Sequence, residues 1–354
     1  MQDKTILIVG TELWGSIFVS KHYIAKYLAE AGNRVFYLNP VCIPWSVQSL
    51  WRLPIRFEKT QIRGLTVISY GNPFPKLASL PFLIQRFIFR YLTRTIRHHI
   101  SDSIDLVWSF DLTRFPELNR WRPSTTLLHL VELFDHPHFQ ESQPFRQEVL
   151  MSADHVITIA DLITDQVSQQ RPDAHQLFHG ADIDGFKTTP NLAEIGRQLP
   201  GNGRLKAGFV GNFQFSFDFK LLSTLAEANP DVDFILIGPR EESSNLGKLD
   251  PKVSEAIQKV ESSPNIKFLG PVPSDQVMAY LVELDINLIL YDQAFWQGHC
   301  NPHKMMAYFY AGKPILASYI HQYRNSPDLV KTTKTKEEFL AAFEQIKSEI
   351  NKDT

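Results

Sequence analysis

The residues best suited to chemistry lie in one stretch, 299–318, which reads HCNPHKMMAYFYAGKPILAS. The pattern predicts a loop, then a helix from Lys304 to Tyr310 with Asn301 as its cap and Pro302 in its first turn, and a strand after Gly312. A helix amino terminus carries free N–H groups and a partial positive charge, to which Lys304 adds a full charge. The stretch therefore predicts an anion-binding site, although an ordinary loop, helix and strand of an α/β domain would read the same way.

A second group of titratable residues follows a predicted strand over 126–131. Glu132, Asp135 and His136 come directly after it, at the end where open α/β sheets bind ligands. Such groups can orient or deprotonate an acceptor hydroxyl. His136 and His138 make only a weak metal pattern because no third ligand has a fixed spacing, so we expect no metal.

Two α/β units are needed to position these groups. A strand over 5–9, a helix over 17–31 and a strand over 35–38 open the first unit, and a second alternation of strands and helices starts at Leu205. The loop after the first strand has only Gly10 and Gly15, so the dinucleotide fingerprint is absent. Pro and Gly in a polar stretch predict a linker. We expect domains over 1–186 and 205–330, a linker over 187–204 and a C-terminal helix over 331–354.

Composition is that of a globular protein: 354 residues, 44% hydrophobic, with a formal net charge of −2. Cys42 and Cys300 lie far apart, which argues against a disulfide framework and favours the reduced cytoplasm. The apolar run Thr5–Val9 is too short for the core of a signal peptide, so we expect neither a signal peptide nor a membrane span. Residues 1–122 hold 16 Lys and Arg against 8 Asp and Glu, whereas the remainder holds 20 against 30. The basic front half suggests an anionic partner surface.

The stretch 83–100, LIQRFIFRYLTRTIRHHI, is a basic amphipathic helix with no acidic residue. Four arginines share one face at three- and four-residue spacing: Arg86, Arg90, Arg94 and Arg97. This pattern is typical of a helix that lies on an anionic membrane, here at the inner face. It also fits a domain helix with an apolar core face and a solvated arginine face. Nucleic acid is the weaker choice because no nucleic-acid-binding motif accompanies the charge.

The 299–318 stretch resembles the nucleotide-sugar segment of GT-B glycosyltransferases of group 1 (family 4-like), N-P-x-K-x-x-E-Y-x-A-x-G-K-P. The matching residues are Asn301, Pro302, Lys304, Tyr308, Ala311, Gly312, Lys313 and Pro314. The segment 178–186 is similar to the family's N-G-V-D-x-x-x-F, with His179 in place of Asn. The resemblance implies an α/β GT-B fold, in which two doubly wound Rossmann-like domains face a central cleft.

The resemblance also implies an activity. Such enzymes move a sugar from a nucleotide diphosphate sugar, here a UDP- or GDP-sugar, to a hydroxyl of a carbohydrate or lipid-linked acceptor, with retention and without a metal or other cofactor. This chemistry belongs to cell-surface polysaccharide or glycolipid synthesis. The catalytic candidates are Lys304, His299, Glu132, Asp135 and His136.

Positions that match the family suggest the two substrate sites. The donor side comprises Gly211, Asn212, Arg240, Gly270, Pro271, Val272, Asn301, Pro302, His303 and Lys304. The acceptor side comprises Trp14, Gly15, His22 and Asp111. For His22, an ordinary solvated position on a helix is the favoured interpretation.

Two positions depart from the family pattern. Ala307 stands where the family has the second Glu of its E-x7-E motif, which holds the donor ribose, and His299 stands at the first Glu. Three hypotheses follow: an active transferase whose ribose contact is supplied differently, a silent GT-B scaffold that serves as a binding or partner subunit, and a sugar-nucleotide epimerase. The last would need acidic and basic residues around the anomeric carbon, and no such constellation is evident.

Overall fold

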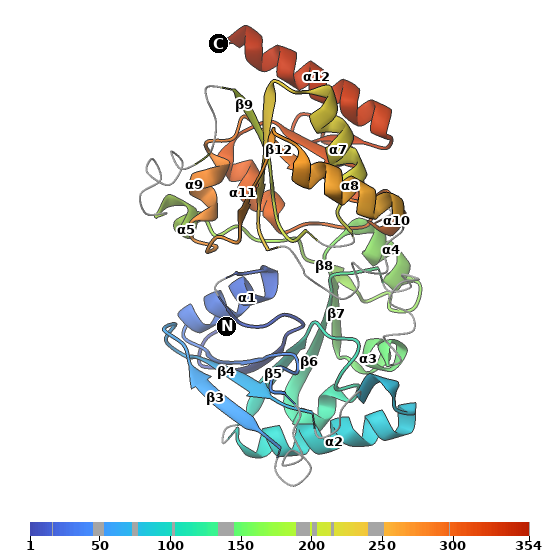
Figure 1. Ribbon diagram of the computed structural model, residues 1–354. Helices are drawn as coiled ribbons and strands as arrows, with labels where there is room; N and C mark the ends of the chain where they lie inside the picture. Colours follow the sequence, from blue (N-terminus) through green and yellow to red (C-terminus); the bar gives the residue numbers. More distant parts are fainter. Residues whose placement is uncertain are drawn as a thin grey trace. The chain divides into compact units, whose positions relative to one another are not determined.

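The computed structural model describes residues 1–15, 17–44, 53–72, 77–100, 103–133, 145–188, 199, 204–213, 216–239, 251–296 and 298–353. The chain forms two compact units, Met1–Phe178 and His179–Thr354 (Figure 1). The segment after Phe178 belongs to the second unit, where Phe186 of α5 (Ile183–Lys187) packs on Tyr310 with ring centroids 5.1 Å apart. Most of the predicted linker lies outside the described residues.

The first unit is built on an eight-stranded sheet in the order β3-β4-β2-β1-β5-β6-β7-β8. All neighbouring strands are parallel except the antiparallel pair β3 and β4. The strands are β1 (Thr5–Val9), β2 (Arg34–Leu38), β3 (Ile55–Lys59), β4 (Leu65–Tyr70), β5 (Ile104–Ser109), β6 (Pro123–Leu130), β7 (His155–Thr158) and β8 (His175–Gln176).

Helices cover both faces of this sheet, because alternate residues of each strand point to opposite sides. Leu7 and Val9 of β1 join the core that includes Leu92 of α2, whereas Ile6 and Ile8 pack in the core that includes Ala25 of α1. The helices are α1 (Ser20–Glu30), α2 (Phe82–His98), α3 (Arg146–Ser152) and α4 (Asp161–Ser168), with 3-10 turns at Leu77–Ser79 and Leu118–Trp121.

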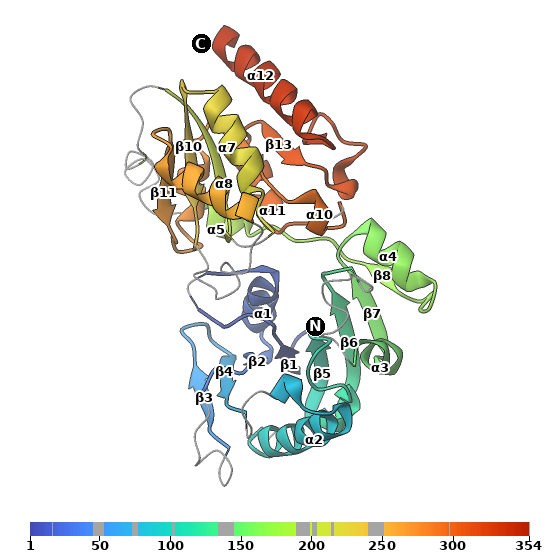
Figure 2. The same ribbon diagram turned by 45° about the vertical axis from the view of Figure 1, so that its right-hand side comes forward.

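The second unit has a six-stranded, wholly parallel sheet in the order β11-β10-β9-β12-β13-β14 (Figure 2). Its strand β10 reads VDFILI and is buried along its whole length, as expected for a strand covered on both faces. The strands are β9 (Leu205–Val210), β10 (Val232–Ile237), β11 (Ile266–Gly270), β12 (Ile286–Ile289), β13 (Ile315–Ser318) and β14 (Lys331–Thr333).

The remaining helices of this unit are α7 (Phe219–Ala228), α8 (Pro251–Ser262), α9 (Val277–Leu281), α10 (Gln293–Trp296), α11 (Lys304–Ala311) and α12 (Lys336–Asp353), with a 3-10 turn at His321–Tyr323. The C-terminal helix starts later than predicted, because Lys331–Thr333 adds a parallel edge strand to β13. Phe339 and Phe343 of α12 are fully buried in the core of the second unit. Within the described ranges, no helix combines the length and the apolarity needed to cross a bilayer.

Both sheets reverse their strand order at one point. In the first unit the reversal lies between β1 and β5, and in the second between β9 and β12. Open α/β sheets bind ligands beyond the carboxyl ends of the strands at such a point. The structure confirms the α/β class and the two parallel-rich sheets, and each sheet has one reversal point at which a ligand site is expected.

Candidate functional site

Lys304 lies at the reversal point of the second unit. Its Nζ is 3.8 Å from the ring centroid of Phe209 on β9 and 5.2 Å from that of Tyr291, which follows β12. Among the described residues, no hydrogen bond or ion pair engages this ammonium group. Burial of the ammonium end lowers the pKa of Lys304 to about 7, against a smaller upward effect of Cys300. Within the described part of the chain, the site therefore holds a cation that lacks an anion.

Glycine turns line the space beside this ammonium group. A Cβ at Gly211, just after β9, would lie 2.2 Å from Lys304 Nζ, and one at Gly238, just after β10, would lie 2.0 Å from the Gly211 carbonyl oxygen. Backbone hydrogen bonds join the three turns, from Gly211 N to Ile237 O and from Gly238 N to Gly270 O, both at 2.8 Å. The predicted donor residues Gly211 and Gly270 are thus on one edge of the sheet, and a side chain at Gly211 would displace the lysine.

The helix that carries Lys304 is fixed to the sheet by a buried tyrosine. Tyr308 is fully buried, and its hydroxyl accepts a hydrogen bond from Val210 N at 2.9 Å and donates one to Leu288 O at 3.2 Å. These amide and carbonyl groups belong to β9 and β12, the strands that flank the reversal point. The helix ends as predicted at Gly312, which has a φ of 67°.

The start of α11 differs from the prediction. His303 is the N-cap, and Asn301 is not, because its Oδ1 accepts a hydrogen bond from the Tyr323 hydroxyl at 3.1 Å. The amide groups of Met305 and Met306 donate to the Pro302 and His303 carbonyls, which uses two of the expected free donors. The ammonium group of Lys304, more than these amides, is therefore the available anion ligand.

Histidines surround the loop before α11. His179 Nε2 donates to the Asn301 carbonyl at 2.7 Å, and its ring meets that of His303 edge to face at 5.1 Å. Burial, helped by the neighbouring His179, lowers the pKa of His303 to about 3, so this ring is neutral. His299 is buried beside Trp296, with ring centroids 5.7 Å apart. Sequence reasoning did not place His179 in the site, and its position shows that it supports the Asn301 loop.

The remaining positions of interest are other donor-side candidates and Ala307, which departs from the family pattern. Asn212 and Pro271 are exposed and Val272 is half-buried, next to the turns after β9 and β11. Ala307 is half-buried on α11 and offers only a methyl group. Arg240, the donor-side candidate with a positive charge besides Lys304, lies outside the described residues.

The reversal point of the first unit holds a cavity of about 430 Å³. It is lined by residues that follow four strands, which include Thr11 and Glu12 after β1, Val41 after β2, Asp111 after β5 and Glu132 after β6. Lys21 of α1 is buried, hydrogen-bonds to Thr11 Oγ1 and forms an ion pair with Glu12. A hydroxyl-rich ligand would meet carboxylate and hydroxyl groups here.

Glu132 is a titratable group of this cavity whose ionisation is altered. Burial raises the pKa of its carboxyl above the ordinary value, Lys21 opposes this rise, and Glu12 and Asp111 add to it. A carboxyl in such a setting is suited to exchange a proton with a bound hydroxyl. Asp135 and His136, the two candidates that follow it in the sequence, lie outside the described residues.

Asp111 is engaged by the protein itself. Its carboxylate accepts hydrogen bonds from Thr113 N at 2.6 Å and Thr113 Oγ1 at 2.7 Å, and it forms an ion pair with Arg114. Arg114 is buried and also donates to Asn39 O at 3.1 Å, to the Tyr70 hydroxyl at 2.7 Å and to Gly10 O. It joins the ends of β1, β2, β4 and β5. Sequence reasoning missed Arg114, because a single arginine after a strand forms no recognisable motif.

The remaining acceptor-side candidates lie around α1. Trp14 packs against Phe18, His22 and Tyr37 with centroid distances of 5.0, 5.3 and 5.2 Å, and Gly15 is exposed. The interpretation of His22 as a solvated residue is wrong: it is 1% exposed, and its Nδ1 accepts from Val19 N at 3.1 Å. Burial lowers the pKa of His22 to about 4, although Glu12 opposes this effect, so the ring is a neutral part of the aromatic wall.

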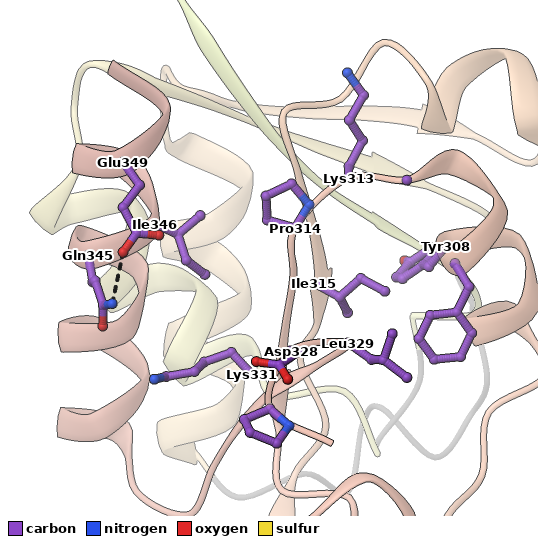
Figure 3. A pocket seen from close by; sticks show the side chains of 13 residues that line it. Tyr308, Lys313, Pro314, Ile315, Asp328, Leu329, Lys331, Gln345, Ile346 and Glu349 are labelled. Atoms are coloured by element: carbon purple, nitrogen blue, oxygen red, sulfur yellow. Dashed lines mark hydrogen bonds between the residues drawn. The ribbon is translucent and has the colours of Figure 1, made fainter. Parts of the chain in front are cut away.

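A larger cavity of about 610 Å³ lies elsewhere in the second unit, between α11, α12 and the amino ends of β13 and β14 (Figure 3). Lys313, Asp328, Lys331 and Glu349 give its wall charges of both signs. Gln345 and Glu349 of α12 are hydrogen-bonded to each other at 2.9 Å. Because it opens at the amino ends of the strands, this cavity is separate from the site at Lys304.

Comparison with solved structures identifies the architecture. Trehalose 6-phosphate synthase from Burkholderia multivorans aligns over 98% of this chain and 91% of its own, with a TM-score of 0.71 and 11% identity. Anabaena HepE in complex with UDP and glucose aligns over 96% and 88%, with a TM-score of 0.66 and 16% identity. The chain has the GT-B glycosyltransferase fold. Sucrose-phosphate synthase from Thermosynechococcus elongatus also aligns over 98% of this GT-B chain and 90% of its own, with a TM-score of 0.68 and 13% identity.

Comparison of sequences finds a match to only part of the chain. No family model matches the chain. A curated relative of Bacillus subtilis (strain 168), named for teichuronic acid biosynthesis as the glycosyltransferase TuaH, is 24% identical over 186 residues. The match covers 49% of this chain and 44% of TuaH, so it spans less than half of that relative's length.

Proposed function

We propose that the chain is a glycosyltransferase that moves a sugar from a nucleotide diphosphate sugar to an acceptor hydroxyl. The donor is a UDP- or GDP-sugar, with UDP favoured because two GT-B neighbours are described with UDP or a UDP-sugar bound. The acceptor is a carbohydrate or a lipid-linked sugar, and the setting is cell-surface polysaccharide or glycolipid synthesis, which the name of TuaH supports. The family resemblance adds retention of configuration without a metal.

The observation that carries the proposal is the ammonium group of Lys304, which has no anionic partner among the described residues. It lies at the strand-order reversal, near two aromatic rings and beside Gly211, where a Cβ would come within 2.2 Å of Lys304 Nζ. A desolvated cation without an anion destabilises the free protein. A bound anion offsets this cost, which favours binding. A diphosphate satisfies this requirement.

The same group explains how transfer would be accelerated. When the bond from the anomeric carbon to the diphosphate breaks, negative charge accumulates on the leaving oxygen. An ammonium group already in position stabilises this charge more than it stabilises the ground state, which lowers the barrier. In the cavity of the first unit, Glu132 would accept a hydrogen bond from the acceptor hydroxyl and take up its proton.

A catalytically silent scaffold is the alternative, and Ala307 favours it. The methyl group of Ala307 cannot hold ribose hydroxyls, and loss of one hydrogen bond to a charged group costs about 1.5–3 kcal/mol. This weakens a donor without abolishing its binding. The two candidates therefore differ in turnover more than in nucleotide binding.

The first experiment is a thermal-shift panel with UDP, GDP, dTDP, ADP and CMP. At about a hundred times its dissociation constant, the correct nucleotide stabilises by about 2.7 kcal/mol. Lys304→Met should lose this shift while keeping its own fold. Lys313→Met is the matched control, because Lys313 belongs to the same motif but lines the cavity at the other end of β13.

Incubation with the matching nucleotide sugar then separates the candidates. Release of nucleoside diphosphate that requires Lys304 supports the transferase. If the nucleotide sugar binds but stays uncleaved when a range of acceptor sugars is supplied, the result supports the silent scaffold. No shift with any nucleotide contradicts the transferase and supports the silent scaffold, with Ala307 and His299 as the reason.

A further inference from the structure

The helix α2 of the first unit exposes a stripe of large apolar side chains. Five of the sixteen large apolar residues exposed among the described residues fall in the ten positions from Phe82 to Tyr91. Leu83 and Phe87 are 74% and 71% exposed, and Tyr91 continues the stripe at the same four-residue spacing. Exposed apolar groups gathered in this way mark an interaction surface.

The arginines of α2 do not form the free basic face predicted from the sequence. Arg86 pairs with Glu148, Arg90 donates to both oxygens of Glu117 at 2.8 and 2.6 Å, and Arg97 donates to backbone carbonyl groups. Three of the four are thus held inside the unit. They fix the helix on its neighbours and turn the apolar stripe outward.

Arg94 is the exception, and it extends the same stripe. It is exposed, and it lies three residues beyond Tyr91, so the face runs from Leu83 and Phe87 through Tyr91 to Arg94 and His98. Among the described residues, the guanidinium group of Arg94 has no hydrogen bond or ion pair. The stripe is apolar in its amino-terminal half and basic in its carboxyl-terminal half.

Charge identifies the occupant. The helix has no acidic residue, and the exposed carboxyl-terminal half of its stripe carries Arg94 and His98, whereas the first unit as a whole is only slightly basic, with 18 Lys and Arg against 16 Asp and Glu. An anionic bilayer is complementary to such a surface, since apolar groups enter the acyl boundary and a basic group meets phosphate. A second copy of the chain would bring two basic ends to one interface without acidic partners on the helix.

We propose that the stripe Leu83, Phe87, Tyr91, Arg94 and His98, with the exposed Ile84 beside it, binds an anionic lipid surface. Leu83 and Phe87 enter the boundary of the acyl chains, and Arg94 contacts lipid phosphate. The paired arginines Arg86, Arg90 and Arg97 orient the helix and do not contact lipid.

The test is co-sedimentation of the full chain with vesicles of phosphatidylcholine, alone or with a quarter phosphatidylglycerol. The double variant Leu83→Ser and Phe87→Ser should lower the partition coefficient into anionic vesicles by about tenfold or more. Arg94→Gln should lower it about fivefold, and only for vesicles that contain phosphatidylglycerol. Leu329→Ser, at a residue 60% exposed in the second unit, is the matched control and should partition like the unaltered chain.

Circular dichroism and the thermal midpoint check that each variant is folded. We expect folded variants because the replaced residues are exposed. The proposal is overturned if the unaltered chain stays with the supernatant of anionic vesicles, or if the double variant sediments as well as the control. It is equally overturned if sedimentation velocity without lipid shows a dimer that only the double variant dissociates, because the stripe would then be an interface between copies.

Discussion

Lys304 shows at the scale of a single residue how burial prepares a side chain for an anion. Burial lowers its pKa to about 7, and a bound diphosphate would raise it again. Above pH 7 most molecules of the free protein carry a neutral Lys304, whereas Lys304 in the complex is protonated. Binding therefore takes up a proton.

Affinity for UDP should consequently fall as the pH rises from 7.0 to 8.5, by at most about tenfold per pH unit. Titration calorimetry in two buffers of different ionisation enthalpy measures both the affinity and the proton uptake. Lys304→Arg should flatten the pH dependence, because a guanidinium group stays charged. Equal affinities and no proton uptake in the unaltered protein would remove Lys304 from the phosphate site.

For Glu132 the pKa shift is upward, whereas that of Lys304 is downward. Its folded pKa is raised, chiefly by burial, so ionisation of this carboxyl destabilises the fold as the pH rises through that pKa. Glu132→Gln removes this penalty. The gain in free energy of unfolding of the variant over the unaltered chain should therefore be larger at pH 8 than at pH 5.

Turnover of the same variant should fall by roughly a hundredfold, because the amide cannot take a proton from the acceptor hydroxyl. Nucleotide-induced stabilisation should stay unchanged. Urea unfolding at the two pH values and initial rates of diphosphate release provide the readouts. An unchanged rate would leave Glu132 with no part in the reaction.

At the scale of elements, α11 depends on the sheet for its position. The Tyr308 hydroxyl joins it to Val210 N and Leu288 O, on the two strands that flank the reversal point. Because these groups are buried, removal of the hydroxyl leaves a donor and an acceptor without partners.

Tyr308→Phe should therefore lower the free energy of unfolding by about 1–3 kcal/mol and weaken UDP binding, since Lys304 is on the same helix. Tyr310→Phe, at an exposed residue two positions further along α11, is the control and should change neither quantity. Urea unfolding and the nucleotide thermal shift measure the two effects. Equal stability of Tyr308→Phe and the unaltered protein would mean that α11 is held by its apolar contacts alone.

At the scale of the whole molecule, the two units bury separate cores and carry net charges of opposite sign. A ligand stabilises most strongly the unit that it contacts. If the nucleotide binds at Lys304, its effect on local opening should be concentrated in the second unit.

Hydrogen exchange with and without UDP tests this distribution. Amides in 204–213 and 298–312 should exchange more slowly with saturating UDP, by about tenfold, whereas those in 104–133 should keep their rates. Lys304→Met serves as the control that abolishes the difference. Equal slowing of exchange in both units would contradict a nucleotide site confined to the second.

Local patterns in the sequence were sufficient for much of the architecture. Buried parallel strands read as short apolar runs that end at Gly, and β9 begins at Leu205 as predicted because it is a continuous apolar segment. The 299–318 stretch also predicted α11, its Gly312 cap and the prominence of Lys304. These features depend on residues close together in the chain, which is why they can be inferred without a structure.

Tertiary structure alone decided which polar groups are free. Asp111 and Arg114 satisfy each other, Asn301 bonds to Tyr323 and does not cap α11, and three arginines of α2 meet carboxylates or carbonyls from other segments. Many such hydrogen bonds and ion pairs join residues tens of positions apart, and a sequence pattern does not encode which partner is reached. The sequence by itself thus determined where cations and carboxylates occur. The fold determined that Lys304 is left without an anion among the described residues, while Lys21, Arg86, Arg90 and Arg114 are paired.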